Sequence, residues 1–324
     1  MIKNTKVLVD EFKNFTGDRY LSLATNSFQN SKGINFSSLK YNNQNVILQT
    51  IVYDDLDVNV FDLLKGINLT GILVDTEFKN NKIDLEKIVL NKFPGSKIIR
   101  YGSNDVTLHA FDLFLSTKIS KNIIKEATVY GAGYLGTNIA AKLANRGILV
   151  NLATTKYDLA EMYSQIANVY HNFKQIRIMN YNGNFANSDL HIGCTSGVQV
   201  VQKEFIEAKI KSNILLDVGG NNFTDKAQLY AKSNANYAYY LSIDEALLGW
   251  LSSFNEVEYS LNSINSQKFK CGHTFIPKGR LISDGEVLVD SLPYPTRIFG
   301  IYRQKTGEVE KFECECITTM YPKI

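Results

Sequence analysis

The chain has 324 residues, of which 44% are hydrophobic, enough to bury more than one core and to form about two domains. Its 35 basic and 32 acidic residues leave a formal charge of +3, which argues against partners such as nucleic acid or an anionic membrane. No apolar run approaches the ~18 residues of a membrane helix. A signal peptide has an uninterrupted apolar stretch, whereas charged residues interrupt the apolar residues near the start of this chain. We therefore expect a cytoplasmic protein with reduced cysteines.

The first 121 residues predict an α/β domain, because short apolar strands alternate with helical patterns. We expect a helix at 34–43 between two of these strands. The other elements are expected at 2–15 (helix), 20–24 and 46–52 (strands), 58–64 (helix), 71–75 (strand), 83–89 (helix), 97–101 (strand) and 106–117 (helix). This alternation favours a mostly parallel sheet, and we expect the domain to bind the substrate.

The most specific pattern is a glycine turn at residues 131–136. A short apolar strand, 127–130, runs into Gly131-Ala-Gly133-Tyr-Leu-Gly136, and a helix with an inner apolar face follows. In a dinucleotide-binding turn the first glycine makes the bend, the second lets the backbone approach a pyrophosphate, and the third lets the helix pack on the strand. We expect Gly131, Gly133, Tyr134, Leu135 and Gly136 to contact the coenzyme; the alternative is a close-packed crossover without a ligand.

The end of the next strand, 148–152, bears on the choice of coenzyme. NAD-preferring sites place an acid there for the ribose hydroxyls. Here Thr154, Thr155 and Lys156 follow instead, and two hydroxyls with a cation suit a 2′-phosphate better. NADP is therefore favoured, and NAD stays possible.

The rest of the nucleotide domain, up to residue 244, predicts further strands and helices. Strands are expected at 176–179, 189–193, 214–220 and 237–241, and helices at 159–173 and 198–208. Because the carboxyl ends of parallel strands line the ligand crevice, we expect Cys194, Thr195, Ser196 and Gly219 to face the coenzyme. Two ordinary tight turns are the alternative.

The last 80 residues, 245–324, predict a helix and a small antiparallel β extension. A hairpin is expected at 281–289 around Asp284-Gly285, and two further strands should flank Lys305-Thr-Gly307. Four potential metal ligands gather in this extension, namely Cys271, His273, Cys314 and Cys316. They could bind zinc, but reduced cysteines in a hairpin core explain them as well, and we expect no metal.

The order of domains and several segments resemble the superfamily of methylenetetrahydrofolate dehydrogenases, shikimate dehydrogenase and methylene-tetrahydromethanopterin dehydrogenases. Gly71-Ile-Leu-Val-Asp75 is similar to the folate enzymes' G-I-L-V-Q strand, and Ile214-Leu-Leu-Asp-Val-Gly-Gly-Asn221 to their V-I-D-V-G-x-N stretch. The resemblance covers residues 18–245. It implies a substrate domain followed by a Rossmann domain, and an NAD(P)-dependent oxidation or reduction.

The resemblance also implies catalytic residues. The folate enzymes' Tyr-x-x-x-Lys turn aligns with Phe36-Ser-Ser-Leu-Lys40, so Lys40 matches their catalytic lysine, and Asp75 stands where they have glutamine. Tyr101-Gly-Ser-Asn-Asp105 looks like the N-T-D segment of shikimate dehydrogenase, which places Asp105 on its aspartate. A lysine near a carboxylate has a tunable proton affinity, and we therefore expect Lys40 to lie beside Asp105 or Asp75.

The sequence thus predicts an NAD(P)-dependent oxidoreductase, acting on a small polar substrate between its domains and forming a homodimer. The folate pattern is altered at its tyrosine and glutamine positions. A dinucleotide-binding regulatory or scaffold protein without catalysis is accordingly the alternative.

Overall fold

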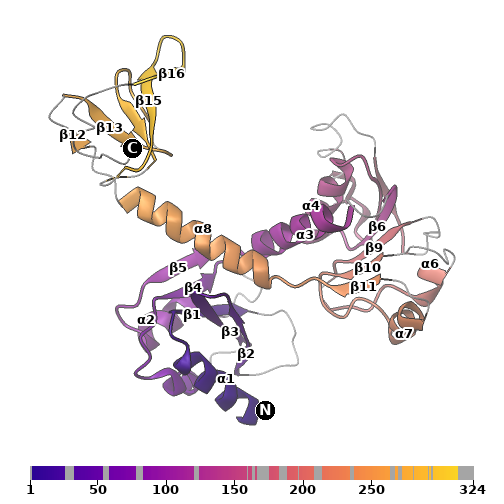
Figure 1. Ribbon diagram of the computed structural model, residues 1–324. Helices are drawn as coiled ribbons and strands as arrows, with labels where there is room; N and C mark the ends of the chain where they lie inside the picture. The colour runs from indigo at the N-terminus through magenta and orange to yellow at the C-terminus, as the bar shows by residue number, and fades with distance from the viewer. Residues whose placement is uncertain are drawn as a thin grey trace. The chain divides into compact units, whose positions relative to one another are not determined.

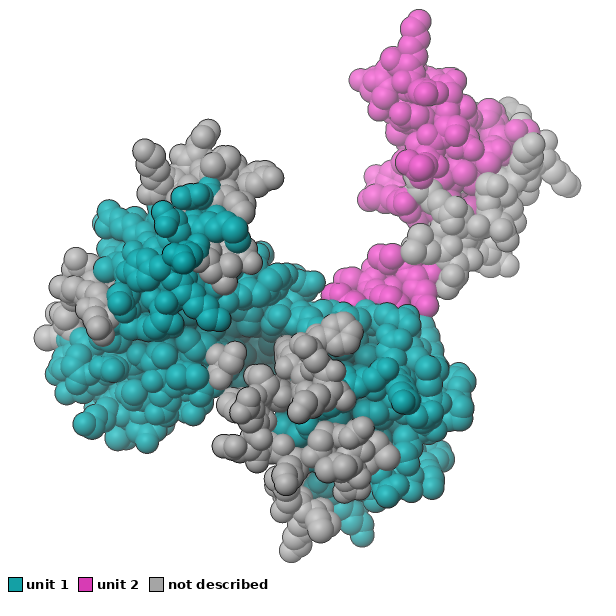
Figure 2. Space-filling view, turned by 180° about the vertical axis from the view of Figure 1, so that it is seen from behind, with its two compact units in different colours: residues 1–248 teal, residues 249–324 magenta. Residues whose placement is uncertain are grey.

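The computed structural model describes most of the chain in two compact units, residues 1–248 and 249–324, shown in Figures 1 and 2. The described residues are 2–25, 33–53, 58–77, 83–119, 124–158, 160–162, 165, 175–181, 188–195, 197–207, 214–233, 237–262, 267–268, 272–279, 281–290, 292 and 295–312. The first unit contains two separate sheets and the second unit a third. The expected division into three parts at residues 121 and 244 stays a prediction.

The first sheet has five strands in the order β2-β3-β1-β4-β5, and all neighbours are parallel except β2 and β3. Its strands are β1 (Asp18–Thr25), β2 (Ile34–Tyr41), β3 (Asn45–Val52), β4 (Gly71–Asp75) and β5 (Ile98–Tyr101). The helices of this part are α1 (Ile2–Asn14), the 3₁₀ helix η1 (Val58–Leu64), α2 (Leu85–Lys92) and α3 (Ser103–Ile119). The core on one face joins α1, η1 and α2 to alternate residues of the strands, among them Phe12, Leu21 and Val89.

One expected helix is wrong, because residues 34–41 form the antiparallel strand β2. A β-bulge between Phe36 and Ser38 shifts the register by one residue. Phe36 therefore pairs with Thr50 and Leu39 with Leu48, two positions on the same face of β3. The two apolar residues are therefore three positions apart in the sequence, which is also the spacing of residues on one face of a helix.

The second sheet is the predicted Rossmann arrangement, with six parallel strands in the order β11-β10-β9-β6-β7-β8. The strands are β6 (Glu126–Tyr130), β7 (Leu149–Ala153), β8 (Ile176–Met179), β9 (Leu190–Gly193), β10 (Ile214–Asp217) and β11 (Tyr237–Tyr240). The chain winds outward from β6 to β8 and resumes at β9 on the other side of β6. The carboxyl end of β6 is thus the topological switch point, where such sheets bind ligands.

Three described helices belong to this sheet: α4 (Tyr134–Ala144), α6 (Lys203–Glu207) and α7 (Asp225–Ser233). The helix expected at 198–208 is shorter than predicted, beginning only at Lys203. The helix expected at 159–173 lies largely outside the described residues.

The second unit carries the predicted C-terminal antiparallel sheet, with one parallel pair within it. Its order is β12-β13-β14-β15-β16, and only β13 and β14 run parallel. These strands are β12 (Gln267–Lys268), β13 (Thr274–Pro277), β14 (Val287–Val289), β15 (Ile298–Arg303) and β16 (Glu308–Glu310), and the helix α8 (Asp244–Asn262) precedes them. The expected hairpin at 281–289 is wrong, because residues 281–283 form no strand and β14 instead pairs with β13 and β15. The edge strand β16 is exposed throughout.

None of the helices in the described part of the chain combines the length and the hydrophobicity that crossing a bilayer requires.

Candidate functional site

The three glycines of the turn after β6 have three different geometric roles. Gly131 has φ +112°, a region that side chains avoid, and Gly136 packs so closely that a Cβ would lie 1.8 Å from the Gly131 carbonyl oxygen. Gly133 differs, because a Cβ built on it meets nothing within 4 Å. Gly133 is also the N-cap of α4 and provides no side-chain cap. The amide-bearing start of α4 is consequently open to an anion.

Two loops at the carboxyl ends of β9 and β10 are joined by one hydrogen-bond network. The Asp217 carboxylate accepts bonds from the Asn222 backbone N–H at 3.1 Å and from its side-chain amide at 2.6 Å. The side-chain amide oxygen of Asn222 (Oδ1) in turn accepts from the backbone N–H of Thr195 at 2.7 Å and from the Thr195 hydroxyl. Because Asn222 is fully buried, this network fixes the shape of the turn beyond Cys194.

Close packing keeps this edge free of larger side chains. A Cβ on Gly219 would lie 2.1 Å from the Thr195 carbonyl oxygen. Burial raises the pKa of the Cys194 thiol well above its usual value, so this cysteine is a neutral thiol rather than a nucleophile. Ser196 lies outside the described residues.

Of the two hydroxyls and the cation predicted after β7, the structure exposes one hydroxyl and the cation. Thr154 is buried, and its hydroxyl oxygen accepts a bond from the Lys156 backbone N–H at 3.0 Å. Thr155 and Lys156 are exposed. Both side chains are therefore accessible to a bound molecule at this strand end.

A carboxylate cluster surrounds the first turn of α3, which we define as Asp75, Glu77 and Asp105. Asp75 accepts bonds from the backbone N–H groups of Glu77 at 3.1 Å and Ser103 at 3.2 Å. Glu77 accepts from the Asn104 backbone N–H at 2.7 Å. Asp75 and Glu77 thus satisfy the first free N–H groups of α3, where negative charge is stabilising.

Asp105 connects this cluster with the glycine turn. Its carboxylate accepts a hydrogen bond from the Tyr134 hydroxyl at 3.1 Å, and this bond raises the pKa of Tyr134. A Cβ on Gly102 would lie 3.0 Å from the other oxygen of Asp105 and 3.3 Å from a Glu77 oxygen, so the two carboxylates approach the same side of this glycine. The sequence-predicted Asp75, Asp105 and Tyr134 therefore belong to one neighbourhood.

The helices that carry Asp105 and Tyr134 are held together by a second set of charges. Asp112 of α3 forms ion pairs with Lys142 of α4 at 2.8 Å and with Arg146 at 2.9 Å. These contacts lower the pKa of Asp112 despite its partial burial. These ion pairs join α3 and α4 at a distance from the glycine turn, toward the C-terminal end of α4.

Lys40 lies elsewhere, and its expected pairing with Asp105 or Asp75 is wrong. Lys40 is level with Ile47 and Tyr20, near the amino ends of the parallel strands, whereas Asp75 is the last residue of β4. Its ion-pair partner is Asp244, in the first turn of α8. Burial lowers the pKa of Lys40 to about 8, and the neighbouring Glu245 opposes this shift.

A cavity of about 590 Å³ opens beside the carboxylate cluster. Asp75 at the end of β4 lines it, together with Thr76 and Glu77 after that strand, Thr25 at the end of β1 and residues of α2. Its volume suits a small molecule. Because hydroxyl and carboxylate groups line it, the molecule would be polar.

No group of three or more His, Cys, Asp or Glu residues in the described part of the chain is arranged to hold a metal ion. Cys271, Cys314 and Cys316 lie outside the described residues, so the zinc alternative stays a prediction.

Sequence reasoning missed Glu77 and Asp244. Glu77 was detectable in principle, since an acid two residues beyond a crevice strand is well placed to reach the next helix. Nothing in the sequence signals Asp244, which lies 204 residues from Lys40.

Comparisons of the sequence with protein-family models and with curated proteins give no match. Among solved structures, the chain is similar to a shikimate dehydrogenase in complex with NADP⁺, with 15% identity, 69% of this chain and 84% of that chain covered, and a TM-score of 0.42. It is also similar to quinate dehydrogenase from Corynebacterium glutamicum in complex with NAD (12% identity, 69% and 88% covered, TM-score 0.40). A third is the A chain of dipicolinate synthase from Bacillus subtilis (12% identity, 76% and 98% covered, TM-score 0.38).

Proposed function

We propose that the protein is an NAD(P)-dependent oxidoreductase that acts on a small polar substrate. The observation that carries this proposal is the turn after β6. Gly131 and Gly136 are required by backbone conformation and packing, whereas the space at Gly133 is left open at the start of a helix. Packing alone gives no reason for a glycine at position 133, but the approach of a pyrophosphate does.

The residues that would hold such a coenzyme follow the strands β6, β7, β9 and β10. Gly131, Gly133, Tyr134, Leu135 and Gly136 would hold the pyrophosphate. After β7, the exposed Thr155 and Lys156 would hold the ribose and favour a 2′-phosphate, while the buried Thr154 would position Lys156 through its backbone N–H. The small residues Cys194, Thr195, Ser196 and Gly219 would face the nicotinamide. When bound, the coenzyme supplies the acceptor or donor of a hydride.

We assign the proton transfer to Asp105. In an alcohol oxidation its carboxylate would take the hydroxyl proton as the adjacent carbon loses a hydride and the carbonyl forms; reduction reverses each step. Its bond to Tyr134 of the glycine turn supports this role. Asp75 would act as a positioning residue, since one of its oxygens (Oδ1) accepts from the backbone N–H groups of both Glu77 and Ser103.

Lys40 is the other candidate for proton transfer. A pKa of about 8 suits proton exchange near neutral pH. Its place near the amino ends of the parallel strands speaks against it, because the crevice of such a sheet lies at the carboxyl ends. Asp105 is therefore our first choice.

Calorimetry with NADPH and NADH tests the coenzyme proposal. We expect both to bind and NADPH to bind more tightly. Lys156→Ala should weaken NADPH about tenfold, because one cation–phosphate contact is lost, and leave NADH unchanged. Absence of binding by either coenzyme would refute the proposal.

Asp105→Asn is expected to lower kcat by about 10² to 10⁴ without changing coenzyme affinity. The amide can still accept from Tyr134 but cannot take a proton. Activity would be followed by NADPH absorbance on shikimate, quinate, lactate and related hydroxy and oxo acids. If Lys40→Met abolishes turnover and Asp105→Asn does not, the assignment moves to Lys40. Coenzyme binding without turnover of any compound favours the regulatory or scaffold alternative.

A further inference from the structure

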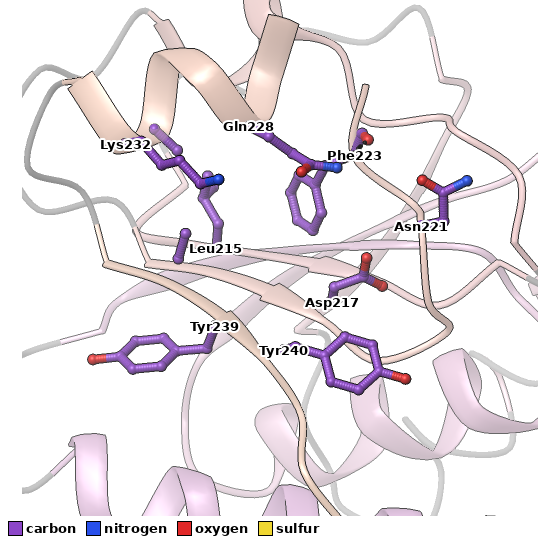
Figure 3. A pocket seen from close by; sticks show the side chains of 10 residues that line it. Leu215, Asp217, Asn221, Phe223, Gln228, Lys232, Tyr239 and Tyr240 are labelled. Carbon is purple, nitrogen blue, oxygen red and sulfur yellow. Dashed lines mark hydrogen bonds between the residues drawn. The ribbon is translucent and has the colours of Figure 1, made fainter. Parts of the chain in front are cut away.

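A second cavity lies in the Rossmann part and has no role in the proposed reaction. Its volume is about 410 Å³, and it is bounded by α7 on one side and by β10 and β11 on the other (Figure 3). All the residues that line it are described.

The register of the two strands explains why this space exists. Leu215 pairs with Ala238 and Asp217 with Tyr240, so these four residues share the face that α7 covers. Opposite them, α7 presents Ala231. Because both Ala238 and Ala231 end at Cβ, helix and edge strand leave a gap that larger side chains would close.

The two ends of the cavity have different chemistry. Figure 3 shows Lys232 at one end, Asp217, Asn221 and Tyr240 at the other, and Phe223 between them. Within the described part of the chain, neither the Lys232 ammonium nor the Tyr240 hydroxyl forms a hydrogen bond or an ion pair. One end thus offers a cation, the other offers acceptors and a phenol, and the Phe223 ring lies between them beside the Gln228 amide.

Asp217 has remaining capacity at its end of the cavity. One of its oxygens already accepts from Gly220 and from the Asn222 amide, and the other accepts only from the Asn222 backbone N–H at 3.1 Å. A carboxylate oxygen can accept two bonds. A ligand amine or hydroxyl can therefore bind there without displacing a protein contact.

We propose that this cavity is a second small-molecule site, for a flat aromatic molecule with a carboxylate at one end and an amine or hydroxyl at the other. The carboxylate pairs with Lys232, the ring lies between Ala231 and Ala238 beside Phe223, and the amine or hydroxyl donates to Asp217. The site is separate from the coenzyme turn at Gly131–Gly136 and does not depend on it.

The probe is 4-aminobenzoate, with benzoate and aniline as molecules that each lack one end group. We expect saturable binding of 4-aminobenzoate to the full chain by ligand-observed NMR or calorimetry, with a Kd below about 1 mM for so small a ligand. Benzoate and aniline should each bind about tenfold more weakly.

Two variants locate the binding. Ala238→Leu fills the gap from an exposed edge position, and 4-aminobenzoate affinity should fall at least tenfold. Lys232→Met, on the exposed side of α7, should weaken 4-aminobenzoate about tenfold and leave aniline unchanged. Leu229→Ala is the matched control, because Leu229 is on the same helix, 64% exposed, and does not line the cavity.

Absence of saturable binding by all three compounds overturns the proposal. Binding that Ala238→Leu leaves unchanged overturns it as well, because the probe then occupies another place. NADPH binding is measured in the same samples. If it fails while 4-aminobenzoate binds as expected, the coenzyme proposal falls and this site stands.

Discussion

Gly133→Ala is expected to abolish coenzyme binding while the fold stays intact. The new methyl group enters open space, and the backbone at φ −78° and ψ −174° suits alanine. The only structural cost is that of alanine at an N-cap, about 1 kcal/mol at most. A pyrophosphate approaching the turn would meet the methyl group, so affinity for NADPH and NADH should fall at least 100-fold in calorimetry.

Gly136→Ala should instead lower the stability of the fold. Its Cβ would lie 1.8 Å from the Gly131 oxygen, so α4 must move away from β6, and we expect a loss of about 3 kcal/mol in the free energy of unfolding. Gly249→Ala is the control, since its Cβ also meets open space within a helix and should add stability without affecting binding. If Gly133→Ala binds coenzyme like the wild type, no pyrophosphate crosses this turn.

Lys40→Met is expected to stabilise the protein at neutral pH. Burial lowers the pKa of Lys40 from 10.5 to about 8, so the folded state disfavours the ammonium more strongly than the neighbouring Glu245 favours it. At about 1.4 kcal/mol for each pKa unit, the difference amounts to about 3 kcal/mol at most. Asp244 is 44% exposed and can be hydrated again once its partner is gone. Denaturant unfolding at pH 7 should show a gain of about 1–3 kcal/mol.

The stability of the wild type and that of Lys40→Met should depend differently on pH. Between about pH 8 and 10.5 the unfolded chain keeps the Lys40 proton and the folded chain has lost it, so wild-type stability rises with pH in this window. Lys40→Met lacks this rise, and its advantage should shrink toward pH 10. Lys142→Met is the control, since it removes a lysine whose side chain is 32% exposed and should cost about 1 kcal/mol or less. A loss of stability in Lys40→Met at pH 7 would contradict the prediction.

Local patterns predicted most of the fold. The turn at Gly131–Gly136 and its flanking strand and helix have the expected positions, because their glycine and apolar spacings reflect contacts within one short segment. Strand β2 was missed for a physical reason that is equally local. The bulge at Phe36 and Ser38 removes the alternation by which a strand is recognised.

The site was only partly predictable, because its geometry depends on distant pairings. Asp105 and Tyr134 were each identified from their own motif, but their hydrogen bond joins two helices. The predicted partner of Lys40 was wrong. Residues 36–40 were matched to a helical motif, which placed Lys40 at the carboxyl ends of the parallel strands instead of near their amino ends. The cavity between α7 and β11 results from two alanines that no motif marks.

The exposed strand β16 has a consequence for self-association. Edge strands present unpaired backbone groups that invite another chain to pair with them. Here Glu308 and Glu310 flank Val309, and Glu310 pairs with Arg303 within the chain. A second copy adding its own β16 antiparallel to this edge would bring carboxylates against carboxylates, so β16 resists edge-to-edge pairing of two copies. Replacing both glutamates by threonine would remove this protection and promote aggregation.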